Sequence, residues 1–253
     1  MTYEIFKRNE LLWGSENQQI LAQKNVAIFG LGGVGGFCAE SLARAGVGKL
    51  TIVDFDTVSQ SNINRQIIAL NSTVGQKKTT LFESRLKDIN PNIQLNVIDD
   101  FYNDKEVIFD FKTQKYDYVA DAIDTMRSKI HLLETCYKNN IPVISSMGAG
   151  NRVDPTQLYI SDLKDIENKN APFVSNVIYQ LKKLGITDGI TFVSSREKPF
   201  VQEKFTENEK ITTASGLGIE FNKIVPASTP FVASVAGIYM ASYIVQSFLK
   251  DYK

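Results

Sequence analysis

The feature that most constrains the fold is a glycine cluster between an apolar run and an amphipathic segment. Residues 26–29 are apolar, and Gly30, Gly32 and Gly35 follow them in the spacing Gly-x-Gly-x-x-Gly. Glycines at these positions permit a tight turn, let a phosphate or ribose approach the backbone, and allow the next helix to pack against the strand. The pattern predicts a β-α-β unit that binds a nucleotide.

A second apolar run belongs to the same unit because it ends in acidic residues. Asp54 and Asp56 follow Val53, and Asp54 lies about twenty residues beyond the last glycine. A carboxylate at the end of the second strand can accept hydrogen bonds from ribose hydroxyls. We therefore expect the nucleotide to lie between the glycine loop and Asp54.

Composition excludes several classes of protein. The 253 residues suit one domain, and 28 basic residues balance 28 acidic ones, so no overall charge attracts nucleic acid or a membrane surface. Cys38 and Cys136 are too few for a disulfide scaffold or for the cysteine pairs of a structural zinc site. The polar N-terminus lacks a secretory signal, and we expect a cytoplasmic protein. The uncharged stretch 225–249 is interpreted as a buried C-terminal helix rather than a membrane span.

Apolar runs alternate with helical segments along the first 150 residues. Further strands are predicted at 94–98, 116–120 and 141–146, and helices at 15–23, 34–44, 75–91, 104–111 and 126–139. This alternation predicts a Rossmann-like, doubly wound α/β fold, with a mainly parallel sheet and helices on both faces.

The regular alternation of strands and helices stops in the last third of the chain, where polar residues become more frequent. Residues 162–213 are predicted to form an inserted lobe, with a helix near 173–184 and a strand near 190–193. We expect a single domain, 1–253, in which residues 1–160 form the nucleotide-binding core. Residues 214–253 would return to this core and end in a helix at 231–249.

Polar residues at the predicted strand ends and helix starts favour ATP over a nicotinamide coenzyme. They are Asn62, Arg65, Gln66, Lys78, Asp121 and Asp124. Transfer at a phosphate develops charge on phosphoryl oxygens and so calls for cations and a metal-binding carboxylate, whereas hydride transfer needs few charged groups. No P-loop motif is present. An NAD-dependent dehydrogenase stays open as an alternative.

Taken together, the motifs resemble those of the ubiquitin-activating-enzyme-like adenylyltransferases of the ThiF type. The matching segments are Gly30-x-Gly32-Gly33-x-Gly35, Val53-Asp54-Phe55-Asp56, Asn62-x-Asn64-Arg65-Gln66, Gly75-x-x-Lys78, Asn90-Pro91 and Asp121-Ala122-Ile123-Asp124. The resemblance implies that Gly32, Asp54, Asn62, Arg65 and Lys78 contact ATP, and that Asp124 supports Mg²⁺ and the reacting phosphate. It also implies a homodimer in which Arg8 reaches into the partner's site.

The expected site follows from these motifs. Its nucleotide-binding residues are Gly30, Gly32, Gly33, Gly35, Asp54, Asp56, Asn62, Arg65, Gln66 and Lys78. The residues expected to carry the reaction are Arg8, Arg65, Lys78 and Asp124, with Asp124 as the metal ligand.

Family members that activate sulfur carriers usually bear two Cys-x-x-Cys zinc pairs and often a catalytic cysteine, and neither is present. Segments 97–101, 148–150, 154–157, 193–199 and 230–237 are instead similar to the zinc-free branch that dehydrates threonylcarbamoyladenosine in tRNA. That resemblance implies ATP-dependent activation of the threonyl carboxylate, followed by ring closure with release of AMP. The modified base supplies its own nucleophile, so no cysteine is required.

Two further functions stay open. The chain could adenylate the C-terminus of a ubiquitin-like sulfur-carrier protein, or it could be a nucleotide-dependent binding or sensing module without turnover. The joint presence of Arg65, Lys78 and Asp124 speaks against the sensing module. Also left open are a monovalent cation near the site and a sulfur-relay protein as a partner beside the tRNA.

Overall fold

The computed structural model describes residues 4–105, 109, 111, 113–200, 206–213 and 215–250. Its helices are α1 (Lys7–Gln23), α2 (Gly35–Ala45), α3 (Lys78–Ile89), α4 (Met126–Lys138), α5 (Pro172–Lys183) and α6 (Pro230–Phe248). Its strands are β1 (Asn25–Phe29), β2 (Lys49–Val53), β3 (Gln94–Ile98), β4 (Tyr118–Asp121), β5 (Val143–Ser146), β6 (Leu158–Asp162), β7 (Thr191–Ser195), β8 (Thr206–Thr212) and β9 (Gly218–Ile224).

Seven strands form one central sheet in the order β3-β2-β1-β4-β5-β7-β6. Neighbouring strands are parallel except for β6, which pairs antiparallel with β7 at the edge. The chain order reverses beside β1, which lies between β2 and β4, and ligands of such open sheets bind at this switch point. The predicted Rossmann-like, mainly parallel α/β fold is confirmed.

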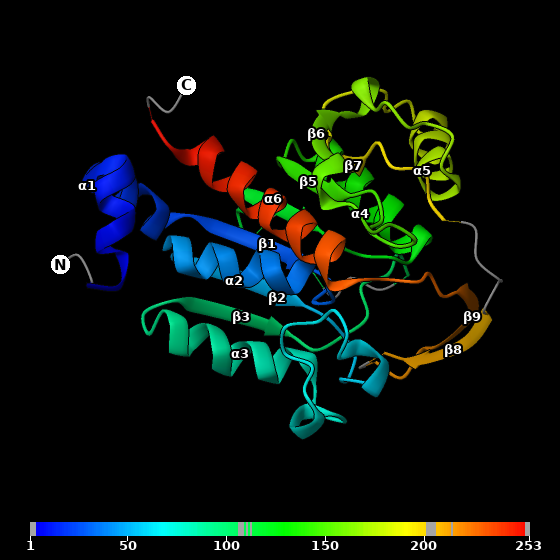
Figure 1. Cartoon of the computed structure of the whole chain (residues 1–253), viewed down its shortest axis with the longest axis horizontal. Helices are drawn as coiled ribbons and strands as arrows, with labels where there is room; N and C mark the ends of the chain where they lie inside the picture. Colours follow the sequence, from blue (N-terminus) through cyan, green and yellow to red (C-terminus); the bar gives the residue numbers. More distant parts are fainter. Residues whose placement is uncertain are drawn as a thin grey trace.

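Helices cover both faces of the sheet, as side chains in β1 show. Val26 and Ile28 belong to a core cluster with residues of α2, α3 and α6, whereas Ala27 and Phe29 belong to a cluster with residues of α4 and α5. Alternate residues of a strand point to opposite faces, so β1 is buried on both. In Figure 1, α6 and α2 lie together across the same face of the sheet.

The C-terminal helix α6 forms part of the core, as expected from its uncharged sequence. Its length and composition would suit a membrane span, but it lies against α2 and contributes buried residues such as Val232 and Met240 to the core cluster. Its closest approach to α2 is at Gly237, where a Cβ atom would lie 2.1 Å from the carbonyl oxygen of Val34. The packing of α6 against α2 therefore depends on the absence of a side chain at Gly237.

The predicted helix at 104–111 is wrong where the structure describes the chain. Asp104, Lys105, Phe109 and Phe111 are not helical, and residues 106–108 and 110 lie outside the described residues. Phe109 and Phe111 both contact Phe29, with ring centroids 4.8 and 5.9 Å apart from it. Residues two apart point to different sides of a helix, so contact of both rings with Phe29 does not fit helical geometry at Phe109 and Phe111.

The segment predicted as an inserted lobe, residues 162–213, is partly built into the sheet. Its strand β7 pairs with β5 and β6, and Phe192 within it is fully buried. Because β7 pairs with a strand on each side, it is buried in the sheet. The polar residues that flank it in the sequence had indicated an inserted lobe instead. The helix α5 and the two-stranded hairpin β8–β9 lie outside the central sheet, and the hairpin extends beyond residue 213. The division of the chain into a core (1–160), an inserted lobe (162–213) and a C-terminal return (214–253) stays a prediction.

The first helix is longer than predicted. It begins at Lys7 and is interrupted at Gly14, whose φ of 85° and ψ of 159° are not helical. Glycine adopts positive φ without steric cost, so the interruption is confined to one residue. The segment predicted as a helix, 15–23, follows this break.

We expect Gly237→Ala to lower the free energy of unfolding by about 2 kcal/mol, because its methyl group would force α6 away from the α2 backbone. Chemical denaturation would measure the loss. Ser242→Ala, at an exposed position of α6, is the control and should change stability by less than about 0.5 kcal/mol. Equal stability of Gly237→Ala and the wild type would show that this close approach is not required.

Candidate active site

The glycine loop follows β1 at the carboxyl edge of the sheet. Gly30 has a φ of 87°, and its amide donates to the carbonyl oxygen of Val53 at 2.9 Å. A Cβ atom at Gly30 would lie 2.8 Å from the carbonyl oxygen of Ala122, and one at Gly35 would lie 1.8 Å from the carbonyl oxygen of Gly30. These glycines are therefore required by the turn itself, which joins the loops after β1, β2 and β4.

Gly32 differs from these two because the space beside it is open. A Cβ atom there would approach only the Gln66 side chain within 4 Å, at 3.7 Å. Gln66 is 7% exposed, and its Oε1 atom has no hydrogen-bond partner among the described residues. A buried acceptor without a partner is costly unless a ligand or water supplies a donor. The space beside Gly32 is thus bordered by Gln66 Nε2, while Oε1 of the same side chain is buried without a partner among the described residues.

Asp54 connects the glycine loop to the turn after β2. One carboxylate oxygen accepts from the Leu31 amide at 2.6 Å, and the other accepts from the Asp56 amide at 2.8 Å. Asp54 is 7% exposed, and its burial raises the pKa of its carboxyl, against the opposing effect of Lys78. The ribose contact expected for Asp54 stays a prediction, but its structural role is clear: it holds the two loops together.

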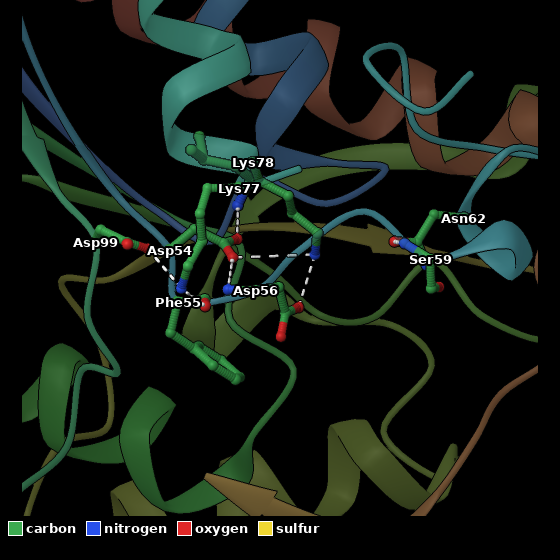
Figure 2. A network of polar contacts seen from close by, with 9 residues as sticks. Asp54, Phe55, Asp56, Ser59, Asn62, Lys77, Lys78 and Asp99 are labelled. Carbon is green, nitrogen blue, oxygen red and sulfur yellow. Dashed lines mark hydrogen bonds and ion pairs between the residues drawn. The ribbon is translucent and has the colours of Figure 1, made fainter. Parts of the chain in front are cut away.

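Lys78 begins α3 and lies between two carboxylates, as Figure 2 shows. Its Nζ atom is 2.6 Å from Asp56 Oδ2 and 3.9 Å from Asp54 Oδ1, and its side chain is 5% exposed. Burial by itself would lower the pKa of Lys78, but Asp54, Asp56 and Asp124 raise it above the ordinary lysine value. The neighbouring Lys77 instead donates to the carbonyl oxygen of Phe55 and pairs with Asp99.

Arg65 lies in the polar turn that follows β2. Its guanidinium donates to the Ser61 carbonyl oxygen at 2.8 Å and to Asn64 Oδ1 at 2.9 Å. Partial burial lowers the pKa of Arg65, and the opposing influence comes from Asp124. Asn62 uses its Oδ1 atom to accept from the Ser59 amide at 3.1 Å, so its side chain holds the turn. A nucleotide contact by Asn62 stays a prediction.

Asp124 is the exposed carboxylate that brings these cations together. It lies in the loop after β4, and its charge acts on both Arg65 and Lys78. The other acidic residue of this loop, Asp121, is fully buried and pairs with Lys129 at 2.6 Å. Asp121 is therefore not accessible to a metal ion, whereas the exposed Asp124 is.

Arg8 lies away from this cluster in its own chain. It is exposed on α1, which leads through Lys24 into the amino end of β1, whereas the glycine loop follows the carboxyl end (Figure 1). The other expected residues come from loops after β1, β2 and β4 and from the start of α3. Action of Arg8 on a partner's site stays a proposal.

Both thiols are unsuited to nucleophilic catalysis. Cys38 and Cys136 are fully buried; burial raises the pKa of Cys38 to about 12, and burial with the nearby Asp121 raises the pKa of Cys136 above its ordinary range. A reactive cysteine needs an accessible thiolate. The described residues also contain no group of three His, Cys, Asp or Glu that could hold a metal ion by itself.

Sequence reasoning missed Lys129. This residue is 0% exposed and lies on the buried face of α4 with Leu132, Leu133 and Cys136. A lysine three, four and seven residues from apolar positions of a helix occupies the apolar face. That spacing was the available signal, because a lysine on such a face needs a buried acceptor.

We expect Lys78→Met to destabilise the protein by about 3 kcal/mol, because it leaves the buried Asp54 carboxylate without its cation. The folded pKa of Lys78 is raised, so its contribution is complete below the ordinary lysine pKa of about 10.4 and is lost as pH rises through the higher folded value. Chemical denaturation from neutral to alkaline pH would measure the free energy of unfolding of both proteins. The difference between Lys78→Met and the wild type should shrink only at high pH.

Lys77→Met is the matched control for this prediction. Its ion pair with Asp99 joins side chains that are 44% and 42% exposed, so its loss should cost less than about 1 kcal/mol. Equal stabilities of the two variants would contradict the role assigned to Lys78.

Comparison with known proteins places this site in a family. The chain matches the ThiF family model over residues 6–251. It is 42% identical to the tRNA threonylcarbamoyladenosine dehydratase of Bacillus subtilis (strain 168), with 97% of this chain and 95% of the relative covered. The Escherichia coli (strain K12) protein of that name is 35% identical, with 88% and 87% covered. The Escherichia coli molybdopterin-synthase adenylyltransferase is 36% identical over only 55% of this chain and 54% of the relative.

Solved structures show the same relationship. The crystal structure of E. coli tRNA N6-threonylcarbamoyladenosine dehydratase in complex with ATP has a TM-score of 0.82 at 30% identity and covers 97% of this chain and 93% of that one. Its complex with AMP has a TM-score of 0.83. The sequence and the fold therefore agree, and the chain belongs to the ThiF family.

Proposed function

We propose that this protein is a tRNA threonylcarbamoyladenosine dehydratase. It activates the threonyl carboxylate of the modified adenosine with ATP and then closes a ring with release of AMP. The observation that carries this function is geometric: Arg65 lies beside Gly33 of the glycine loop, and Lys78 pairs with the acids after β2. The charge of Asp124 acts on both cations, and the two thiols of the chain are buried. The Bacillus subtilis relative of this name covers 97% of this chain, and the Escherichia coli one has been solved with ATP.

The residues present fit a nucleotide triphosphate with its metal ion. Gly32 leaves open space beside the loop, bordered by the Gln66 Nε2 atom, which could donate to an acceptor of the ligand. Arg65 and Lys78 supply positive charge for phosphoryl oxygens. Asp124 would hold Mg²⁺, since this ion is commonly bound by one or two carboxylates together with substrate phosphates. When bound, the ion would help to neutralise phosphate charge.

The reaction joins two displacements. An oxygen of the threonyl carboxylate attacks the α-phosphorus of ATP, and the bond to pyrophosphate breaks. Lys78 and Arg65 offset the negative charge that develops on the phosphoryl oxygens. A nucleophilic atom of the modified base then attacks the activated carbonyl carbon, loses its proton, and displaces AMP. Because the nucleophile belongs to the substrate, no protein thiol takes part.

A homodimer would complete the site. Arg8 is exposed on α1, away from the glycine loop of its own chain, and a two-fold dimer can carry such a residue into the partner's site. We place the reaction in the cytoplasm, where two unpaired cysteines are stable as thiols.

The purified protein with ATP should convert threonylcarbamoyladenosine in tRNA to a product lacking one water molecule, with release of AMP. Mass analysis of the tRNA nucleosides measures this change. Asp124→Ala should keep the wild-type melting temperature and lose ATP-dependent cyclisation, because it removes the carboxylate beside Arg65 and Lys78. Unchanged turnover in this variant would remove Asp124 from the mechanism. Adenylation of sulfur-carrier proteins, with the threonylcarbamoyladenosine of the tRNA left unconverted, would support the alternative function instead.

Sharing of the site between protomers is tested by mixing variants. Arg8→Ala and Asp124→Ala should each be inactive alone, whereas a mixed dimer would hold one site with both residues intact. If subunits exchange freely, the mixture should recover about a quarter of wild-type activity. Arg8→Lys, assayed alone, shows whether charge at this position suffices. Absence of recovery, with mixed dimers demonstrated by mass spectrometry, would contradict a shared site.

A further inference from the structure

Three polar side chains are completely buried beneath the loop that carries Asp124. Asp121 ends β4, Lys129 lies in the first turn of α4, and Ser145 lies in β5, and all three are 0% exposed. Lys129 Nζ donates to Asp121 Oδ2 at 2.6 Å and to Ser145 Oγ at 3.1 Å. Ser145 Oγ in turn donates to the same Asp121 oxygen at 2.6 Å. The Oδ2 atom of Asp121 is therefore held from two directions.

The other oxygen of Asp121 acts on the loop itself. Asp121 Oδ1 accepts from the Ile123 amide at 3.0 Å, and Ile123 directly precedes Asp124. The amide of Ala122 donates to the Phe29 carbonyl oxygen at 2.8 Å, which attaches the same loop to β1. Rotation of the Asp121 carboxylate would remove the acceptor of Ile123. The direction in which the backbone leaves toward Asp124 thus depends on how Asp121 is held.

Stability by itself does not explain this buried pair. Removing a carboxylate and an ammonium from water is costly, and well-packed apolar residues often hold a core as firmly as an ion pair does. The neighbouring buried positions of α4, Leu132 and Leu133, are apolar and show the residue type that suits this face. What an apolar pair cannot supply is an acceptor for the Ile123 amide.

We propose that Asp121 is a positioning residue for the adenylation reaction: its carboxylate, held by Lys129 and Ser145, binds the Ile123 amide and thereby places Asp124. The inference rests on the proposed function, in which Asp124 acts beside ATP. Lys129 and Ser145 are themselves fully buried, so they act through Asp121 and do not touch the nucleotide.

Two double variants separate positioning from stability. Lys129→Met with Asp121→Leu replaces the ion pair by apolar side chains and leaves Ile123 without its acceptor. Lys129→Met with Asp121→Asn also removes both charges but keeps an oxygen for the Ile123 amide. We expect similar melting temperatures for the two proteins. The leucine variant should lose about 100-fold in kcat, as misplacement of a reacting group does, while the asparagine variant keeps most of its turnover.

Amide hydrogen exchange gives a readout that needs no turnover. Exchange at Ile123 should be slow in the wild type and in the asparagine variant, and at least about tenfold faster in the leucine variant. The half-saturating Mg²⁺ concentration for ATP binding, measured by calorimetry, should rise in the leucine variant as well. Lys138→Met, which breaks an exposed ion pair with Glu134 on the same helix, is the matched control and should change none of these values.

Failure of the positioning role can be distinguished from failure of the proposed function. Equal kcat and equal Ile123 exchange in the two double variants would overturn the positioning role. If either double variant fails to fold, Ser145→Ala decides: faster exchange at Ile123 with a melting temperature near that of the wild type supports the proposal, and unchanged exchange contradicts it. A wild-type protein inactive on modified tRNA would refute the proposed function, while the exchange comparison would still test the positioning.

Discussion

A buried carboxylate between two loops organises the ligand edge of this protein. Asp54 accepts the amides of Leu31 and Asp56, so the glycine loop after β1 and the turn after β2 are held as one unit. Burial disfavours the charged form of this carboxyl, and Lys78 opposes that effect. The need to balance Asp54 thus places a cation beside the glycine loop, where a phosphate can use it.

The same arrangement recurs at β4, which lies on the other side of β1 from β2. β4 ends in the buried Asp121, which pairs with Lys129 from the helix that follows, and its other oxygen accepts a loop amide. In both places a buried acid shapes the backbone, while a more exposed acid a few residues later, Asp56 or Asp124, lies near the cations. The carboxyl edge therefore separates residues that hold the loops from residues able to meet a substrate.

Much of this site was predictable because its residues lie in short motifs with local causes. The glycine spacing, the acids after two strands and Lys78 at a helix start each follow from what one turn or one helix end requires. Lys129 was missed because its partner Asp121 is brought to it by the packing of α4 on the sheet. The helix predicted at 104–111 was wrong at its described residues, where Phe109 and Phe111 both contact Phe29 from a distant part of the chain.

By itself, the sequence determined the alternation of strands and helices, the nucleotide loop and the class of chemistry, because hydrophobic periodicity and glycine spacing are local properties. The tertiary structure decided the rest: that β7 enters the central sheet, that Asp121 is buried while Asp124 is exposed, and that the charge of Asp124 acts on both Arg65 and Lys78. Which of two neighbouring acids faces solvent depends on packing between segments far apart in the chain, and no local pattern carries that information.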